Sequence, residues 1–285
     1  MHKLDEFESL FRSAVKDVFN YAAPDLKRVL IVSDLPGAET EALQKRVEHF
    51  LRTIDESHDL IWQAIGLADW VSVEGLLQKV QSLAPDLIVT YRHLGDPHTD
   101  VPHTLGSAVD VLTQATSTPV LLLPPPQRED FDQLLTGTHK VMVVTDHITG
   151  DDGLVNWGVH FTNKQGTLYL AHVEDDTELE RYLEVIDKLR SLDSNAARKD
   201  LPEKLLSIPR EYIGTIADVL AKHQIEETVV PLVVLGHALG YYKRLMTEND
   251  IDLLVLNTKD AQQQAMHAMA HALAVEIRHA PLLLL

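Results

Sequence analysis

Two aspartates stand where short β-branched runs end, and a carboxylate at such a position could take part in chemistry. RVLIVSD ends at Asp34 and KVMVVTD ends at Asp146. Phosphoacceptor chemistry would also need an acidic cluster around the phosphorylated aspartate and a lysine on the last strand. The two candidate last strands, Pro119–Leu123 (PVLLL) and Pro281–Leu285 (PLLLL), contain no lysine. The sequence also lacks Gly-x-Ser-x-Gly, His-Glu-x-x-His and Walker loops, so it supports neither hydrolase nor kinase chemistry.

A histidine-rich segment offers a second kind of chemistry. His93, His98 and His103 recur every five residues, with Asp96 and Asp100 between them. Imidazole and carboxylate ligands suit zinc, nickel or copper, so a loop that brings these side chains together could bind a transition metal. The same string is typical of an ordinary polar loop with two prolines, and spacing alone is weak evidence for a metal site. We therefore predict that this loop holds no metal.

His267 and His271 are four residues apart near the end of the chain, a spacing that could hold a metal ion on one face of a helix. They lie beside an apolar stripe that runs from Met266 to Ile277. We interpret them as part of a helix that packs on the core, and assign no metal ligand.

The elements that must position these residues occur twice along the chain. Asp34 and Asp146 are 112 residues apart, and a second aspartate-led strand follows each, Asp86–Val89 (DLIV) and Asp252–Val255 (DLLV). Each half then closes with a proline and an apolar run. A period of this length is too long for a solenoid repeat and fits two small α/β domains. Strands that alternate with helices favour parallel pairing, with helices on both faces of the sheet.

The domain boundaries follow from the repeat. We predict an N-terminal helix and a trimmed domain over residues 1–124, a proline-rich linker over 125–138 and a fuller domain over 139–285. The second half has 54 additional residues between its first strand and its DLLV strand, so the first half lacks one strand–helix unit. One of the additional strands, 228–235, contains Pro231. Proline cannot donate to a ladder, so this strand is predicted at a sheet edge.

Composition limits the classes of function. The chain has 25 basic and 43 acidic side chains, a net charge of −18 and no block of lysine or arginine, which argues against nucleic acid and membrane partners. It has no cysteine and no apolar run of the ~20 residues that a spanning helix needs, so we expect a cytoplasmic protein. The amphipathic helix predicted over residues 3–20 has an acidic outer face. We expect it to pack on the protein, where it could cover the face that the first half leaves open.

The order of these features resembles the universal stress proteins, in their tandem two-domain form. The resemblance covers residues 27–285. It rests on first strands that end in Asp34 and Asp146, on the DLIV strand, on Gly106 and Ser107 at the start of a helix, and on the PVLLL ending.

This resemblance implies an α/β fold of two tandem, doubly wound parallel-sheet domains of the adenine-nucleotide alpha-hydrolase type. Each domain would have the strand order 3-2-1-4-5. The resemblance also implies that the last strands, 119–123 and 282–285, pair antiparallel and make the two domains an intramolecular pseudo-dimer.

Nucleotide binders of that family carry a Gly-x2-Gly-x9-Gly-Ser/Thr loop after the fourth strand. Glycines let backbone N–H groups approach phosphates, and the final Gly-Ser opens a helix whose N-terminus attracts negative charge. The aspartate that ends the first strand contacts the adenine or ribose side. The resemblance therefore implies a cofactor site for ATP in the first domain only, formed by Asp34, Gly95, Gly106 and Ser107.

The loop of the first half departs from that pattern. Counted back from Gly106, the two upstream glycine positions of the pattern are occupied by His93 and Asp96. Gly95 is the glycine that remains nearby, one residue before the second of these positions. The matching segment of the second half, 257–267, contains no glycine. We therefore favour the interpretation that Gly106 is kept for folding.

These features predict a stress-response protein that binds an as yet unknown protein partner, with degenerate nucleotide sites and no enzymatic activity. The alternative is an ATP- or AMP-binding stress sensor with one site in the first domain. Two such chains could also associate as a homodimer, and the sequence is compatible with this. Nucleotide that copurifies with the protein would distinguish the two hypotheses.

Overall fold

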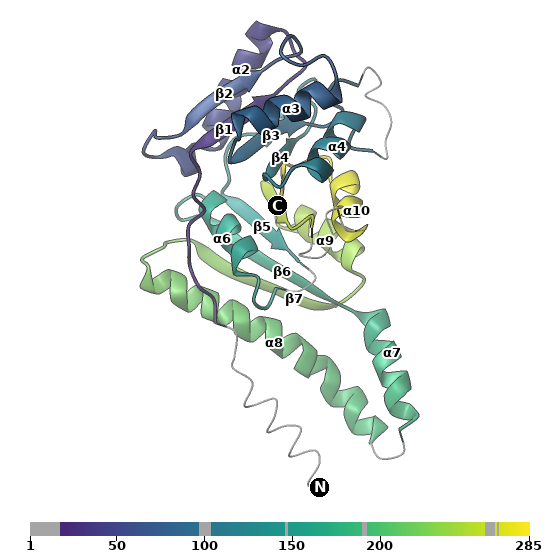
Figure 1. The fold of residues 1–285 in the computed structure, drawn as a ribbon. Helices are drawn as coiled ribbons and strands as arrows, with labels where there is room; N and C mark the ends of the chain where they lie inside the picture. The colour runs from purple at the N-terminus through teal and green to yellow at the C-terminus, as the bar shows by residue number, and fades with distance from the viewer. Residues whose placement is uncertain (1–17, 97–103, 146–147, 190–192, 260–265, 267) are drawn as a thin grey trace.

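The computed structural model describes residues 18–285 with the exception of 97–103, 146–147, 190–192, 260–265 and 267. In this part of the chain the strands form one sheet of nine strands, in the order β2-β1-β3-β4-β9-β8-β5-β6-β7 (Figure 1). The strands are β1 (Arg28–Val32), β2 (Ile61–Ile65), β3 (Leu87–Tyr91), β4 (Val120–Leu123), β5 (Lys140–Val144), β6 (Thr167–Asp175), β7 (Thr228–Gly236), β8 (Leu253–Leu256) and β9 (Leu282–Leu284).

Each half of the sheet is parallel and is built around its first strand. β1 pairs with β2 and β3, and β5 pairs with β6 and β8. The second half therefore shows the predicted order 3-2-1-4-5, and the first half shows the same order without its third strand. Every residue of β3, β4, β8 and β9 is buried. Their sequences, apolar except for Thr90 and the Tyr91 hydroxyl in β3, are those expected of strands covered on both faces.

The two halves join through their last strands. β4 and β9 pair antiparallel, with Val120 opposite Leu284 and Leu122 opposite Leu282. The predicted pairing of 119–123 with 282–285 is thus confirmed, and the strands that end the two halves lie in the interior of the combined sheet. The antiparallel pair completes the backbone hydrogen bonding of both strands, which would otherwise be apolar edges.

The helices among the described residues alternate with the strands, as the repeat predicted. They are α2 (Gly37–Phe50), the 3₁₀ turn η1 (Arg52–Asp55), α3 (Val73–Leu83), α4 (Ser107–Ala115), α5 (Phe131–Leu134), α6 (Asp152–Phe161), α7 (Asp176–Asp187), α8 (Ser194–Lys222), α9 (Ala238–Glu248) and α10 (Ala268–Glu276). α7 and α8 extend beyond the sheet of the second half (Figure 1). In the part of the chain that is described, none of the helices is long and apolar enough to cross a membrane.

The two ends of the sheet differ. β7 forms one end and carries Pro231, so the predicted edge position of this strand is confirmed. β2 forms the other end, where the first half has no third strand. Its sequence, IWQAI, contains no proline and no charge.

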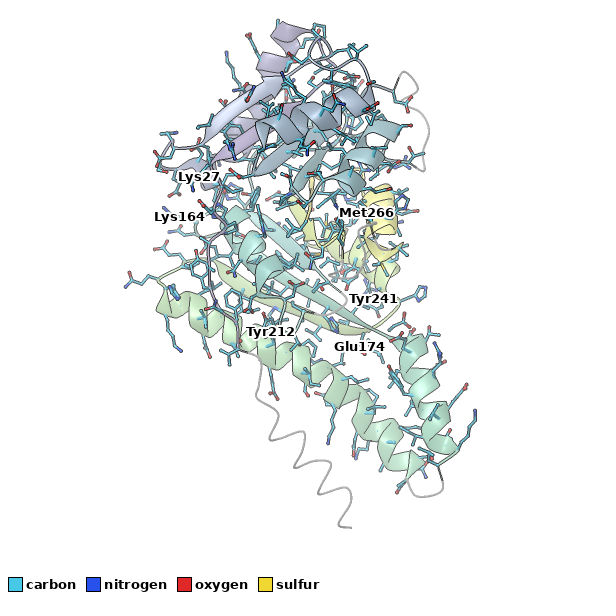
Figure 2. The ribbon with its side chains drawn as sticks, viewed as in Figure 1. Lys27, Lys164, Glu174, Tyr212, Tyr241 and Met266 are labelled. Atoms are coloured by element: carbon cyan, nitrogen blue, oxygen red, sulfur yellow. The ribbon has the colours of Figure 1, made fainter. Side chains whose placement is uncertain are left out.

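The linker segment packs against the core. It contains the short helix α5, and it buries Phe131 and Leu135 in the core, with the guanidinium of Arg46 over the Phe131 ring. The linker contacts both halves, because Arg52 donates to the Thr136 carbonyl at 3.2 Å and Thr138 Oγ1 donates to Asn163 Oδ1 at 3.0 Å. The two halves also meet directly where Lys164 pairs with Glu56; Lys164 is labelled in Figure 2.

The predicted helix over residues 3–20 lies mostly outside the described residues. Its described end, residues 18–20, is not helical. Phe19 is buried there, and its backbone N–H donates to Thr215 of α8 at 3.2 Å. The described segment therefore packs on the second half. The predicted cover of the open face of the first half concerns residues outside the described part of the chain and stays a prediction.

Candidate functional site

The candidate site lies at the carboxyl ends of β1 and β3. In doubly wound sheets, the loops that follow two such neighbouring strands run to opposite faces of the sheet. The crevice between these two loops is where folds of this kind bind ligands. Asp34 follows β1, and Gly95 follows β3. The structure brings the two together, because the Gly95 N–H donates to Asp34 Oδ2 at 2.9 Å.

Tyr91, the last residue of β3, occupies the other side of the Asp34 carboxylate. Its hydroxyl donates to Asp34 Oδ1 and accepts the backbone N–H of Asp34 at 2.9 Å. The hydroxyl also lies 3.2 Å from Ser33 Oγ. Burial, and after it the hydrogen bond to Asp34, raises the pKa of Tyr91. Both carboxylate oxygens of Asp34 therefore already have a donor within the protein.

Gly95 is fixed by an aromatic neighbour as well as by Asp34. Its φ is +68°, and a Cβ at this position would lie 3.0 Å from the ring of Trp70. Trp70 is buried, and its indole N–H donates to the Ser33 carbonyl at 3.2 Å. Strand β1, the Trp70 ring and the turn after β3 thus form one packed unit around Asp34.

Gly106 is the N-cap residue of α4 and lies against the backbone of His93. Its φ is +100°, and a Cβ there would lie 2.7 Å from the Cα of His93. The backbone N–H of His93 donates to the Leu105 carbonyl at 2.7 Å, which holds the two segments together. The Gly106 N–H donates to Thr104 Oγ1 at 2.9 Å, and the Ser107 side chain is exposed. A close backbone approach thus requires glycine at position 106.

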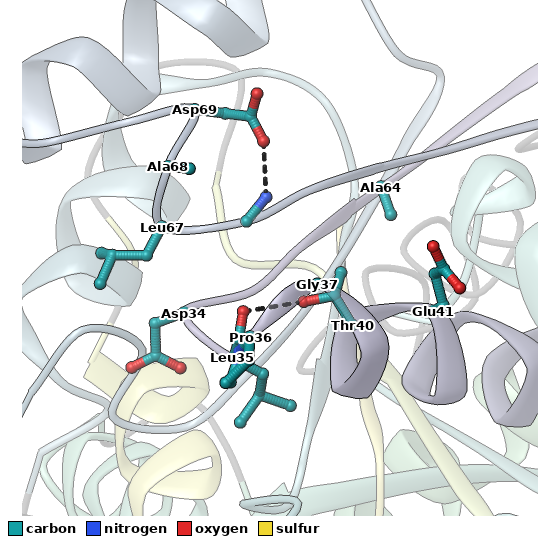
Figure 3. A pocket seen from close by; sticks show the side chains of 11 residues that line it. Asp34, Leu35, Pro36, Gly37, Thr40, Glu41, Ala64, Leu67, Ala68 and Asp69 are labelled. Carbon is teal, nitrogen blue, oxygen red and sulfur yellow. Dashed lines mark hydrogen bonds between the residues drawn. The ribbon is translucent and has the colours of Figure 1, made fainter.

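A cavity of about 430 Å³ lies beside Asp34, between the ends of β1 and β2 and the start of α2 (Figure 3). A volume of this size is within the usual range for a small-molecule site. Its walls are mostly apolar. Its lining residues are Asp34, Leu35, Pro36, Gly37, Thr40, Glu41, Ala64, Gly66, Leu67, Ala68 and Asp69.

Among the described residues, the lining of the cavity has acidic groups and no basic group. Asp69 Oδ2 accepts the backbone N–H of Gly66 at 2.9 Å, and Thr40 Oγ1 donates to the Leu35 carbonyl at 3.0 Å (Figure 3). The lining therefore offers apolar surface to a ring system, and its negative charge disfavours phosphate.

Several predicted site positions lie outside the described residues. They include Asp146, His98, His103, Asp100 and His267. Among the residues that are described, no three histidine or acidic side chains stand close enough to hold a metal ion. His93 is buried, and His271 is exposed on α10.

Solved structures show the same architecture. A protein from Pseudomonas aeruginosa UCBPP-PA14 that is described as a universal stress protein superimposes with a TM-score of 0.51. The alignment covers 92% of this chain and 94% of that one at 11% identity. The chain has the universal stress protein fold. The likeness spans nearly the whole length of both chains and so includes both halves of the nine-stranded sheet.

A universal stress protein from Archaeoglobus fulgidus DSM 4304 is similar over 91% of this chain and 85% of its own, with a TM-score of 0.49 and 11% identity. No protein-family model matches the sequence. No curated protein matches it at a significant level.

Tyr91 is the site residue that sequence analysis missed, and the register between β1 and β3 explains its position. β1 and β3 pair with Ile31 opposite Val89. Two residues further on, Tyr91 is level with Ser33 and so reaches Asp34. The sequence did contain a signal: Tyr91 is a large polar residue at the end of one strand, and Asp34 follows the end of the neighbouring strand.

Proposed function

We propose that this chain is a tandem universal stress-type protein that acts in a stress response by binding a protein partner and has no enzymatic activity. In this proposal the first-half nucleotide site, at Asp34, Gly95, Gly106 and Ser107, is degenerate. We place the protein in the cytoplasm, because a chain without cysteine has no need of an oxidising compartment.

The internal hydrogen bonds of the Asp34 carboxylate carry this proposal. A ribose hydroxyl or an adenine amino group would need an acceptor at Asp34, and each oxygen of this carboxylate already accepts one internal hydrogen bond, from the Tyr91 hydroxyl or the Gly95 N–H. A ligand would have to share these oxygens with the internal donors or displace one of them. Replacing an internal hydrogen bond by one to a ligand gains little free energy, since one bond is exchanged for another. The acidic lining of the cavity adds a repulsive contribution for a triphosphate.

The second candidate is a sensor with one adenine nucleotide in the first half. The cavity of about 430 Å³ beside Asp34 favours it, because its apolar walls could accept a base. Glu41 and Asp69 would then face the sugar or phosphates, so a bound cation would be needed to offset their charge.

Calorimetric titration with Mg-ATP tests the choice. The proposal predicts no saturable binding by the wild-type chain and none by Asp34→Asn. One site per chain that is lost in Asp34→Asn, and is kept in the exposed control Asp25→Asn, would establish the sensor instead.

A further inference from the structure

Strand β2 is an end strand whose outer side has no neighbouring strand in the described part of the chain (Figure 1). On its inner side, the Ile61 N–H and the Ile65 carbonyl bond to the chain of β1, at 2.8 and 3.0 Å. Backbone groups of successive residues in a strand point to opposite sides. The N–H and C=O groups of Trp62 and Ala64 therefore point outward, away from β1. We call these four groups the β2 edge.

Two aspartates bound the β2 edge. Just before the strand, Asp55 accepts the Leu60 N–H at 3.1 Å. Just after it, Asp69 accepts the Gly66 N–H at 2.9 Å. Residues 60 and 66 alternate with those that face β1, so both of these N–H groups also lie on the outer side. The chain thus supplies acceptors for the outer donors at both ends of β2 and leaves the two central residues for another strand.

The sequence of β2 does not protect this edge. Edge strands are usually kept from pairing with other chains by charged side chains, proline or a bulge. The sequence IWQAI has no charge and no proline, and the Ile61 side chain is 63% exposed. At the opposite end of the sheet, β7 does carry a proline, Pro231. The two ends therefore differ in their capacity to accept a further strand.

The β2 edge is complementary to a second copy of itself. A two-fold axis through Gln63 sets Trp62 of each chain opposite Ala64 of the other, in an antiparallel pair. Opposed residues of this kind exchange both of their N–H···O bonds, so all four groups of each β2 edge find a partner. The two Gln63 side chains, which are exposed in the single chain, then meet on the axis as neutral amides. No charged residue of one strand faces a charged residue of the other.

We propose that this chain forms a homodimer through β2, in which two nine-stranded sheets join edge to edge. The chain already joins its own two half-sheets by an antiparallel pair, β4 with β9. A two-fold interface uses the same patch on both copies and closes on itself, so association stops at two chains. The dimer interface is separate from Asp34 and from the protein partner of the proposed function.

Residues 1–17 are the competing occupant from within the chain. They precede Phe19, whose N–H donates to Thr215 of α8. α8 packs on β6 and β7, which are at least seven strand spacings, about 34 Å, from β2 (Figure 1). A helix of 17 residues is about 26 Å long. The helix predicted from the sequence would therefore fall short of the β2 edge, and we assign this edge to a second copy.

Size-exclusion chromatography with light scattering, and sedimentation to measure the dissociation constant, test the proposal on the full chain. Salt of about 0.15 M limits repulsion between two chains of net charge −18. We expect the wild-type protein to have the mass of two chains. Gln63→Lys and Gln63→Glu each set like charges opposite one another on the axis and should weaken association roughly fivefold. An equimolar mixture of the two variants should restore it, because lysine then faces glutamate.

Ala64→Pro removes an outward N–H and leaves the bonds to β1 in place. It should yield a single chain, because two of the four hydrogen bonds across the axis are lost and proline blocks the ladder. Gln81→Lys, at an exposed position of α3, is the matched control and should remain a dimer.

A wild-type protein with the mass of one chain at its highest soluble concentration would overturn the proposal, and would leave the β2 edge to residues 1–17 or to a strand of another protein. A dimer that Ala64→Pro and both Gln63 variants leave unchanged would overturn it too, since a different surface would then hold the copies together. If Ala64→Pro does not fold, the two Gln63 variants and their mixture decide, because this side chain is exposed in the single chain.

Discussion

Replacing Gly106 by alanine tests whether this glycine is kept for folding. The backbone of Gly106, with φ +100° and ψ 143°, lies in a region that L-residues rarely adopt, which costs about 1–3 kcal/mol. The new Cβ would also lie 2.7 Å from His93 Cα and 3.0 Å from His93 N. These are backbone atoms that cannot rotate away, so overpacking adds about 1–3 kcal/mol. We expect Gly106→Ala to lower the free energy of unfolding by about 2–6 kcal/mol.

Urea unfolding followed by circular dichroism measures this loss from the midpoint and the slope of the transition. Gly214→Ala is the matched control. Gly214 lies inside α8, and a Cβ there would meet no atom within 4 Å, so this substitution should stabilise the helix by about 0.5–1 kcal/mol. A Gly106→Ala protein as stable as the wild type would refute the structural role of this glycine.

Other substitutions test the interface, the site and the pH dependence. Deleting Leu282–Leu285 removes β9 and exposes β4, so we expect self-association in light scattering; Leu283→Ala, at a fully buried position, should cost about 2–5 kcal/mol in urea unfolding. A truncated chain that stays monodisperse, or a Leu283→Ala protein of wild-type stability, would argue against the joined sheet. Tyr91→Phe leaves Asp34 Oδ1 without its donor and should cost about 1–3 kcal/mol; no loss in urea unfolding would contradict the contact. Burial lowers the pKa of His160, so the unfolded chain takes up a proton near its ordinary value of about 6.5 while the folded chain resists it. The unfolded state then binds more protons, and the free energy of unfolding should fall as the pH drops from about 7 toward 5. His160→Leu should flatten that slope, and an unchanged slope would show that His160 is not responsible.

The strands were predictable from sequence because each carries its own local signal, whereas their order was implied by the resemblance to the universal stress proteins. β-branched runs ended by aspartate marked β1 and β5, and Pro231 marked the edge strand β7. The closing apolar runs are hydrophobic throughout, which suits strands that are buried on both faces and paired on both sides.

The side-chain contacts of the site were harder to predict, since they join residues far apart in sequence. Tyr91 reaches Asp34 only because of the register of β1 and β3, and Arg92 meets Ile277 across 185 residues. Phe131 is an example from the linker: its burial, with the Arg46 guanidinium over its ring, joins residues 85 positions apart and has no local signal in the polar sequence around it.

Native mass spectrometry of the purified full chain tests the central claim most directly. Because the Asp34 carboxylate is already hydrogen-bonded within the protein and stands beside an acidic cavity, we predict that the protein copurifies without ATP or AMP, and that added Mg-ATP gives no adduct of fixed stoichiometry. A single bound ATP or AMP per chain, lost in Asp34→Asn and kept in Asp25→Asn, would contradict the degenerate site and establish a nucleotide sensor.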